Sequence, residues 1–286
     1  MTISIADAVR EGAEILQRAG LAQPRREASD LVQHVLALDR TFVLAHPEQL
    51  MSHEQGQTFR ELLLRRASGE PLQYLTTHQS FFGLDFEVTK GVLIPRPETE
   101  LLVETALGFL KNIPAPQAIC DVGTGSGCIA ITLLHECSNA HAVAIDVSPS
   151  ALEVAKRNAR RHAVEERLTF VEADCFSSLS ADKLSFDLIV SNPPYVAETE
   201  LAGLQREVRD HEPREALAGG PDGLDVVRRL LNESSAFLKS RAHLLIEIGF
   251  NQGEAVQTLV DERVWRLQEI RPDLQGIPRL VILQKK

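Results

Sequence analysis

"AICDVGTGSGCIAITLLHEC" (residues 118–137) joins a short apolar run to a longer apolar segment through a turn that contains three glycines. The first run has the length of a buried strand, and the second has the length of a helix. Glycines at 123, 125 and 127 let the backbone turn tightly and approach a ligand without a Cβ in the way. The helix that follows points its free N–H groups into the same space. The stretch therefore predicts a strand, a ligand-holding turn and a helix in succession.

The alternation of strand and helix continues to the end of the chain. The predicted strands are residues 118–123, 141–148, 168–176, 186–195, 243–250, 265–270 and 279–284. The predicted helices are residues 97–110, 128–137, 149–164, 223–238 and 253–260. Such alternation indicates a parallel sheet that is covered by helices on both faces. Only the segment 271–278 separates the last two strands, which is too short for a crossover helix, so these two should pair antiparallel. The prediction is an α/β fold with a mostly parallel seven-stranded sheet and an antiparallel end.

The chain before this sheet has a different pattern. Residues 1–75 show apolar positions at helical spacing, with Ser4 and Ser52 placed to begin helices, and predict a small helical bundle. In residues 76–97, "SFFGLDFEV" (80–88) alternates as a strand does, and "TKGVLI" (89–94) is predicted to return as its hairpin partner. We expect three parts: a helical domain at 1–75, a hairpin linker at 76–97 and a large α/β domain at 98–286.

Composition limits the classes of function. The formal net charge of −10 disfavours a nucleic-acid substrate, because proteins that follow a phosphate backbone usually carry a basic face. The four cysteines show no metal-ligand spacing, so we expect reduced thiols and no metal site. No segment resembles a signal peptide or a membrane span, so a cytoplasmic protein without membrane association is expected.

The turn after the first strand predicts a nucleotide site. Asp146 ends the second strand, where a carboxylate can accept both hydroxyl groups of a ribose. "GSGCIA" (125–130) also satisfies the dinucleotide pattern G-x-G-x-x-A, so a nicotinamide enzyme is a rival interpretation. That rival needs a group that takes part in hydride transfer, and the sequence proposes none. A glycine turn with a purely structural role is a further alternative.

"SNPPY" (191–195) follows the apolar run that forms the fourth strand. The Asn192 side chain offers an acceptor oxygen, and Pro193 offers a backbone carbonyl that the rigid ring geometry holds outward. Two such acceptors can grip both hydrogens of a planar –NH₂ group and aim its nitrogen at a methyl donor. Both hydrogen bonds strengthen as positive charge grows on that nitrogen, which stabilises the transition state without a general base. Pro194 stiffens the turn, and Tyr195 supplies a flat wall. The alternative is a turn that only ends the strand.

These motifs together resemble class I S-adenosylmethionine-dependent methyltransferases with the Asn-Pro-Pro-Tyr signature, which have a Rossmann-like fold. The resemblance is closer to the release-factor glutamine methyltransferase family (HemK-like) than to adenine N6-methyltransferases. It spans nearly the whole chain, and the stretches that carry it are "DVGTGSG", "SNPPY", "RTFVLAH", "GEPLQYLT", "LIPRPETE", "HEP" with "ALAGGPDGLDVVRRL", and "LLIEIGFNQGEAV".

The resemblance implies transfer of a methyl group from S-adenosylmethionine to the side-chain amide nitrogen (N5) of the Gln in a Gly-Gly-Gln motif. The implied partners are class I peptide chain release factors, which the N-terminal helical domain would recognise. The implied catalytic residues are Asn192 and Pro193, and the implied substrate contacts are Asn192, Pro193, Pro194 and Tyr195. The implied cofactor contacts are Gly123, Thr124, Gly125, Ser126, Gly127, Asp146, Cys175, Asn192, Arg96 and Thr99. Some family members carry an aromatic residue where Cys175 stands, so ring stacking on adenine is not implied there.

Three alternatives stay open at this stage. The first is glutamine methylation of a ribosomal protein, which uses the same catalytic motif. The second is adenine N6-methylation of nucleic acid by base flipping. The third is a binding module that uses the cofactor fold only to recruit partners.

Overall fold

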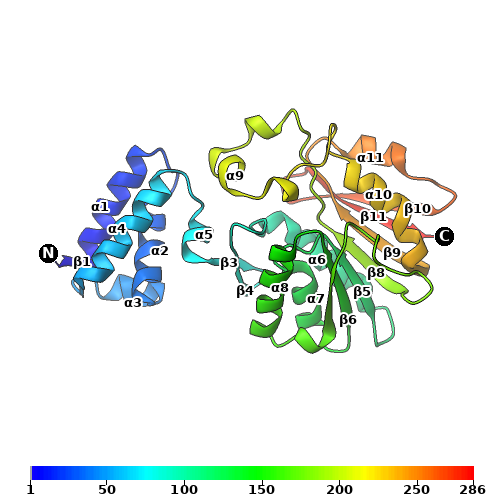
Figure 1. Cartoon of the computed structure of the whole chain (residues 1–286), viewed down its shortest axis with the longest axis horizontal. Helices are drawn as coiled ribbons and strands as arrows, with labels where there is room; N and C mark the ends of the chain where they lie inside the picture. The colour runs from blue at the N-terminus through cyan, green and yellow to red at the C-terminus, as the bar shows by residue number, and fades with distance from the viewer. Residues whose placement is uncertain (1) are drawn as a thin grey trace. The chain divides into compact units, whose positions relative to one another are not determined.

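The computed structural model describes residues 2–286. Its centre is a seven-stranded sheet with the order β10-β11-β9-β8-β5-β6-β7 (Figure 1). The strands are β5 Ala118–Val122, β6 His141–Asp146, β7 Leu168–Glu172, β8 Phe186–Ser191, β9 Leu238–Glu247, β10 Trp265–Pro272 and β11 Pro278–Lys285. The strands from β7 to β9 are parallel, and β11 pairs antiparallel with both β9 and β10. The predicted fold class and the antiparallel end are confirmed.

Helices cover both faces of the sheet. They are α6 Glu100–Leu110, α7 Cys128–Glu136, α8 Pro149–Arg161, α10 Asp225–Glu233 and α11 Gly253–Leu259. Helices α6, α7 and α8 contribute to one hydrophobic cluster, whereas α10 and α11 contribute to a second cluster that packs on the other face (Figure 1). The central strands between them are largely buried, and β8 is buried along its entire length. Burial on both faces explains why these strands appear in the sequence as continuous apolar runs.

Strands β5 and β8 lie side by side although two further strands separate them in the sequence. The chain runs from β5 outward to β6 and β7, and then returns to place β8 on the other side of β5. Such a reversal of strand order creates a crevice at the carboxyl ends of the two central strands, where open α/β sheets bind ligands. Because Val122 pairs with Ser191, the residues that follow these two strands leave the sheet next to each other.

The N-terminal part is helical, as predicted. Its helices are α1 Ile5–Arg18, α2 Pro24–Leu36, α3 Arg40–Ala45, α4 His53–Ala67 and α5 Leu72–Thr76. Ser4 caps α1 by accepting a hydrogen bond from the Asp7 backbone N–H, and Ser52 forms a capping box with Gln55 at the start of α4. The sequence did not predict the short pair of strands β1 Ile3–Ser4 and β2 Leu50–Met51.

The predicted hairpin is present, but its partner strand was wrong. The structure forms the hairpin from β3 His78–Phe81 and β4 Leu84–Glu87, so the turn lies within the stretch 80–88 that was predicted as one strand. Phe82 and Gly83 between them both have positive φ, as a two-residue hairpin turn of the primed type requires. Residues 89–94, predicted as the returning strand, form no strand.

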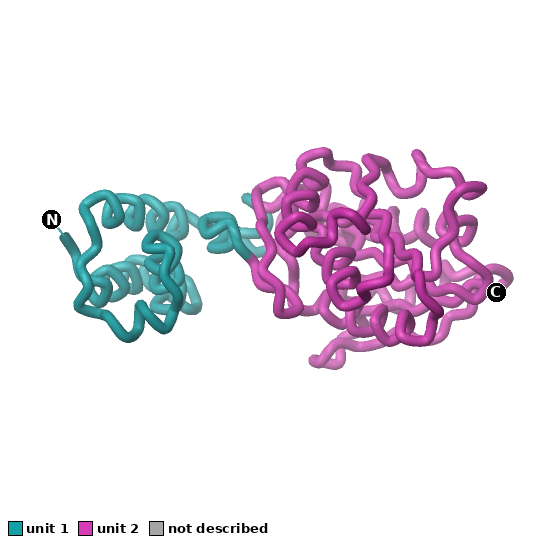
Figure 2. Tube along the Cα trace, turned by 90° about the horizontal axis from the view of Figure 1, so that it is seen from below, with its two compact units in different colours: residues 1–78, 205–211 teal, residues 79–204, 212–286 magenta. Residues whose placement is uncertain are grey.

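The chain divides into two compact units (Figure 2). One contains the residues up to His78 together with Gln205–His211, and the other contains Gln79–Leu204 and Glu212–Lys286. The inserted segment includes α9 Arg206–His211. Its Glu207 pairs at 2.9 Å with Arg66, a buried residue of α4.

Short 3-10 turns complete the description: η1 Pro97–Thr99, η2 Glu165–Arg167, η3 Leu201–Gly203, η4 Arg214–Ala216 and η5 Ser234–Phe237. No helix among residues 2–286 is long and apolar enough to cross a membrane.

Candidate functional site

The glycine turn after β5 is fastened to the end of β6. The backbone N–H groups of Gly123 and Thr124 both donate to the carbonyl oxygen of Ile145 at 2.9 Å. The Gly125 N–H donates to Asp146 Oδ2 at 2.8 Å, and the Ser148 N–H donates to the other carboxylate oxygen at 2.9 Å. The structure thus brings together the predicted loop and the predicted acidic residue. Each Asp146 oxygen keeps a lone pair for a further donor.

The three glycines of the turn have different roles. All three have positive φ, which favours glycine at each position. A Cβ at Gly125 would meet no atom within 4 Å, so its backbone faces open space. A Cβ at Gly127 would lie 2.7 Å from Ile131 Cδ1, so this glycine permits close packing of α7. A Cβ at Gly123 would point toward the Asn192 carbonyl oxygen at 3.9 Å, which confirms that the two motifs adjoin.

A buried carboxyl group lies beneath the turn. Asp121 on β5 is completely buried, and its Oδ2 accepts hydrogen bonds from Thr124 Oγ1 at 2.7 Å and from the Ala130 N–H at 3.3 Å. Its Oδ1 has no hydrogen-bond partner. Burial, only partly offset by these hydrogen bonds, raises the pKa of Asp121 to about 7. The nearby Ser126 hydroxyl oxygen is also buried without a partner.

The Asn-Pro-Pro-Tyr turn presents one unused acceptor. Asn192 Nδ2 donates to Thr99 Oγ1 at 3.1 Å, while Asn192 Oδ1 is buried and has no partner. The carbonyl oxygen of Pro193 likewise accepts no backbone hydrogen bond from any residue of 2–286. Buried acceptors are normally satisfied, so an orphaned oxygen calls for an explanation such as a missing ligand.

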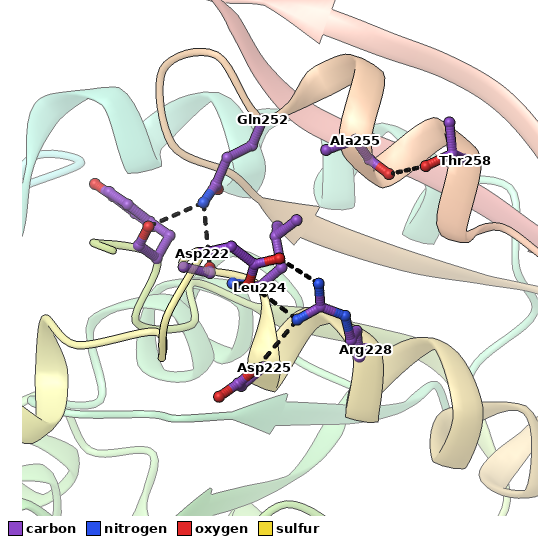
Figure 3. A network of polar contacts seen from close by, with 9 residues as sticks. Asp222, Leu224, Asp225, Arg228, Gln252, Ala255 and Thr258 are labelled. Carbon is purple, nitrogen blue, oxygen red and sulfur yellow. Dashed lines mark hydrogen bonds and ion pairs between the residues drawn. The ribbon is translucent and has the colours of Figure 1, made fainter. Parts of the chain in front are cut away.

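The backbone on the far side of this turn is held by two loops. The Val196 N–H donates to the Leu217 carbonyl, and the Gly219 N–H donates to the Val196 carbonyl, each at 2.9 Å. Gln252 Nε2 donates to the carbonyl oxygens of Tyr195 at 2.9 Å and Gly223 at 3.2 Å (Figure 3). In the same view Arg228 of α10 contacts Asp222 and Asp225. These contacts hold the loop at residues 219–223 against the start of α10. The turn is therefore rigid on both sides.

Thr99 and Arg96 were predicted to contact a cofactor. Thr99 is 2% exposed, and its hydroxyl group lies between Asn192 and the carboxylate of Glu247. Arg96 is paired with the buried Glu212, which also accepts a hydrogen bond from the Ile94 N–H at 3.2 Å. The structure therefore gives both side chains protein partners, and a cofactor contact for either one stays a prediction.

Cys175 lies in the hydrophobic cluster under α10 and is 6% exposed. Burial raises the pKa of its thiol to about 11, so it is an uncharged apolar group at neutral pH. The preceding Asp174 is ion-paired with Arg229. The predicted role of Cys175 beside an adenine ring stays a prediction.

Sequence reasoning missed three residues of this region. Glu247 at the end of β9 is 2% exposed, and its Oε2 has no partner. The signal was an acidic residue within the apolar stretch "LLIEIG", which is unusual for a buried strand. Gln252 follows in the same stretch and had no distinctive spacing. Val147, directly after Asp146, is 57% exposed and therefore leaves an apolar surface beside the carboxylate.

Two surface cavities lie away from these residues. One of about 950 Å³ is lined by β10 and the C-terminus, including Trp265 and Lys286, and the other of about 810 Å³ lies among α1, α2 and α3. No residue of the glycine turn or of the Asn-Pro-Pro-Tyr turn lines either cavity. The orphaned buried oxygens mark the candidate site. Residues 2–286 contain no group of three potential metal ligands.

The fold and the site define the class of methyltransferases built on a Rossmann-like sheet. Two solved structures share the fold: a methyltransferase from Pyrococcus furiosus and a 16S rRNA methyltransferase from T. thermophilus. The first has 17% sequence identity and a TM-score of 0.51, covering 79% of this chain and 97% of its own. The second, solved with AdoMet and guanosine, has 16% identity and a TM-score of 0.53, covering 73% and 49%.

Closer relatives narrow the class to one family. A release factor glutamine methyltransferase of Nitratidesulfovibrio vulgaris is 42% identical over 97% of this chain and 94% of its own. A protein of the same name from Moorella thermoacetica is 40% identical over 99% of each chain. The family profiles "PrmC N-terminal domain" and "Methyltransferase small domain" match residues 7–76 and 98–210. The chain belongs to the release factor glutamine methyltransferase family, and the predicted family is confirmed.

The buried Asp121 predicts how stability changes with pH. Its pKa in the folded protein, about 7, lies above the ordinary value of 3.8, so the folded state binds more protons than the unfolded state between these values. Its contribution to stability is therefore present at low pH and is lost as the pH rises toward 7. Asp121→Asn should gain up to about 4 kcal/mol of unfolding free energy relative to wild type between about pH 4 and pH 8. Urea unfolding of both proteins across this pH range measures the difference in unfolding free energy. A difference that does not change with pH would contradict the raised pKa of Asp121.

Gly219 predicts a second effect, on the Asn-Pro-Pro-Tyr turn. A Cβ there would lie 2.6 Å from the backbone oxygens of Pro194 and Gly223, so Gly219→Ala must displace backbone. We expect the rate of methyl transfer to fall by about 100-fold, since misplacing a positioning group by about 1 Å has an effect of this size. Gly108→Ala is the control, because a Cβ there meets nothing within 4 Å. Equal rates in the two variants would show that the turn tolerates displacement.

Proposed function

We propose that this protein transfers a methyl group from S-adenosylmethionine to the side-chain amide nitrogen (N5) of the glutamine in the Gly-Gly-Gln motif of class I peptide chain release factors. The observation that carries the proposal is the buried, unpartnered Asn192 Oδ1 beside the Pro193 carbonyl. The names of the relatives with about 40% identity over almost the full chain support the same substrate. The helical part, residues 1–75, is proposed to select the release factor.

The residues of the glycine turn fit the proposed cofactor. Gly125 leaves open space, the two Asp146 oxygens have free lone pairs, and the buried Ser126 hydroxyl oxygen lacks a partner. Residues 123–127 and Asp146 would hold the nucleoside part, with Val147 and Cys175 as apolar neighbours. The bound cofactor supplies an electrophilic methyl group on a sulfonium sulfur. Backbone N–H groups and a carboxylate are the groups that hold nucleotides in doubly wound sheets.

Asn192 and Pro193 would orient the substrate amide. An amide nitrogen is a weak nucleophile because its lone pair is delocalised into the carbonyl group. Asn192 Oδ1 and the Pro193 carbonyl would each accept one N–H of the –NH₂ group and so aim the nitrogen at the methyl carbon. In the proposed transfer, the amide nitrogen would bond to the methyl carbon as the carbon–sulfur bond breaks, and one amide proton would leave to solvent. Both hydrogen bonds strengthen as the nitrogen becomes positive, which lowers the barrier.

Tyr195 contributes shape rather than proton transfer. Burial and the neighbouring Glu247 raise the pKa of its phenol to about 12, so it stays neutral at physiological pH. Its backbone is held by Gln252, and a Cβ at Gly249 would lie only 3.1 Å from Tyr195 Cδ2. The ring is therefore fixed in position, as a flat wall for a planar amide must be.

The alternative substrates have an –NH₂ group too. An adenine amino group could be gripped by the same two acceptors, and so could a glutamine of a ribosomal protein. No contact in the structure favours either one, and the net charge of −10 disfavours nucleic acid. We therefore propose no nucleic-acid substrate and no membrane partner. A cytoplasmic location is proposed because translation termination takes place there.

Methylation of purified proteins tests the substrate. The enzyme is incubated with S-adenosylmethionine labelled in its methyl group and with a release factor that carries either Gln or Ala at the Gly-Gly-Gln position. We expect label in the Gln form only, and mass mapping should place it on that residue. Equal labelling of both forms, or label in DNA, RNA or a ribosomal protein instead, would reject the proposed substrate.

Two substitutions separate the two halves of the site. Asn192→Ala should lower kcat by about 100-fold, because it removes an acceptor that tightens in the transition state, while cofactor affinity changes little. Asp146→Ala should weaken cofactor binding and affect kcat less at saturating cofactor. Calorimetric titration of the cofactor together with steady-state kinetics measures both. The opposite pattern would make Asn192 chiefly a cofactor ligand.

A further inference from the structure

Behind the proposed substrate site, the partly buried Asn192 side chain contacts Thr99, and Thr99 in turn interacts with Glu247. Asn192 Nδ2 donates to Thr99 Oγ1 at 3.1 Å, and the Thr99 hydroxyl group interacts with the Glu247 carboxylate, where it lowers the pKa that burial raises. Thr99 and Glu247 are each 2% exposed. They come from different elements, since Thr99 precedes α6, Asn192 follows β8 and Glu247 ends β9. These contacts therefore exist only in the folded sheet.

The direction of these hydrogen bonds follows from chemistry. An ionised carboxylate can only accept, so Thr99 must donate its one hydroxyl hydrogen to Glu247. The Thr99 oxygen is then left with lone pairs only, and it can be satisfied by the –NH₂ end of Asn192 but not by its oxygen. With Nδ2 directed to Thr99, Oδ1 must point the other way, where it is buried and unpartnered.

We propose that Glu247 and Thr99 are positioning residues that lock the Asn192 amide with its oxygen toward the substrate, and that this lock makes the site select glutamine over glutamate. The inference rests on the proposed function, because it concerns the same substrate side chain. It assigns a purpose to a buried acid that makes no contact with the proposed reacting atoms.

Such a lock is needed because the two ends of an amide have almost the same shape. Turned by 180°, Asn192 would present Nδ2, a donor, and the site would accept a carboxylate oxygen. In the locked orientation, Asn192 Oδ1 and the Pro193 carbonyl are both acceptors. A glutamine –NH₂ satisfies both, whereas a glutamate side chain offers only oxygens and leaves buried acceptors facing a negative charge. A site built to hydrogen-bond one group rejects an analogue that lacks it.

The surroundings of Glu247 keep it available for this role. Arg279 is the cation that most lowers the pKa of Glu247. Its guanidinium, however, donates to Asp273 at 3.4 Å and to the Ile248 carbonyl at 3.2 Å. Arg96 and Glu98 act on Glu247 with opposite sign. Burial raises the pKa of Glu247 to about 7, so the direction of these hydrogen bonds is fixed most firmly above neutral pH.

Four variants test the lock. Thr99→Val removes the hydroxyl group at nearly constant volume, and Glu247→Leu frees the Thr99 hydrogen to donate to Asn192 Oδ1. Thr99→Ser is the conservative variant, because it keeps the hydroxyl group that Thr99→Val removes. Thr105→Val is the matched control, because Thr105 is a buried threonine of α6 that bonds Arg271 at 2.9 Å instead of Asn192. Unfolding curves confirm that each variant is folded.

The readout is discrimination between two forms of the release factor. Dissociation constants are measured for the Gln form and for a form with Glu at the same position, with S-adenosylhomocysteine bound to prevent turnover. The experiment is run at about pH 8.5, where a carboxyl group with a pKa of about 7 is ionised. Wild type should prefer the Gln form by at least about tenfold, as expected for an unpaired buried charge. Thr99→Val and Glu247→Leu should lose most of that preference, while Thr99→Ser and Thr105→Val should retain it.

Kinetics provide a second readout. Thr99→Val should lower kcat by about tenfold and Thr99→Ser should restore it, because a freely turning amide presents its oxygen only part of the time. The inference is overturned if both lock variants keep the wild-type preference, or if wild type itself binds the two forms equally. Its failure is distinct from failure of the proposed function, in which wild type would not label the Gln form at all.

Discussion

The pairing of β5 with β8 is the constraint on which the site depends. Their parallel register ends with Val122 opposite Ser191, and Ser191 Oγ donates to the Val122 carbonyl at 2.7 Å. The glycine turn and the Asn-Pro-Pro-Tyr turn therefore leave the sheet as neighbours, at the point where strand order reverses. A shift of one residue in this register would move Asn192 away from both Gly123 and Thr99. Backbone pairing alone therefore brings together the turn proposed for the cofactor and the turn proposed for the substrate.

Buried acidic groups at this edge reduce the stability of the protein on its own. Asp121 and Glu247 each have one carboxylate oxygen without a partner, and burial raises the pKa of both to about 7. A core built only for stability would use apolar residues at these positions. Retaining such groups is characteristic of functional sites, where perturbed carboxyl groups cluster. The protein tolerates this unfavourable burial because each face of the sheet carries a hydrophobic cluster of more than twenty buried residues.

The sequence predicted the mostly parallel sheet and its antiparallel end, because the type and length of each element follow from apolar periodicity and the last connection is short. It did not predict the contacts that depend on three-dimensional placement. Thr99 and Asn192 meet across 93 positions of sequence, and only the packing of the segment before α6 on the sheet brings them together. The hairpin was predicted with the wrong partner because the turn at Phe82 needs positive φ, which is uncommon for a bulky residue. The placement of Gln205–His211 with the helical unit had no local signal in the sequence.

The geometry of the turn also indicates where specificity must arise. Two acceptors and a flat ring would fit any planar –NH₂ group, and a fold by itself does not fix the substrate. The lock on Asn192 distinguishes an amide from a carboxylate, but it cannot distinguish glutamine from adenine or one protein from another. That choice must come from surfaces outside the turn. The helical unit matches the profile "PrmC N-terminal domain", and it also holds α9 from the loop that follows the Asn-Pro-Pro-Tyr turn. Substrate choice and substrate grip are therefore connected through a continuous stretch of chain, from Tyr195 to Glu207.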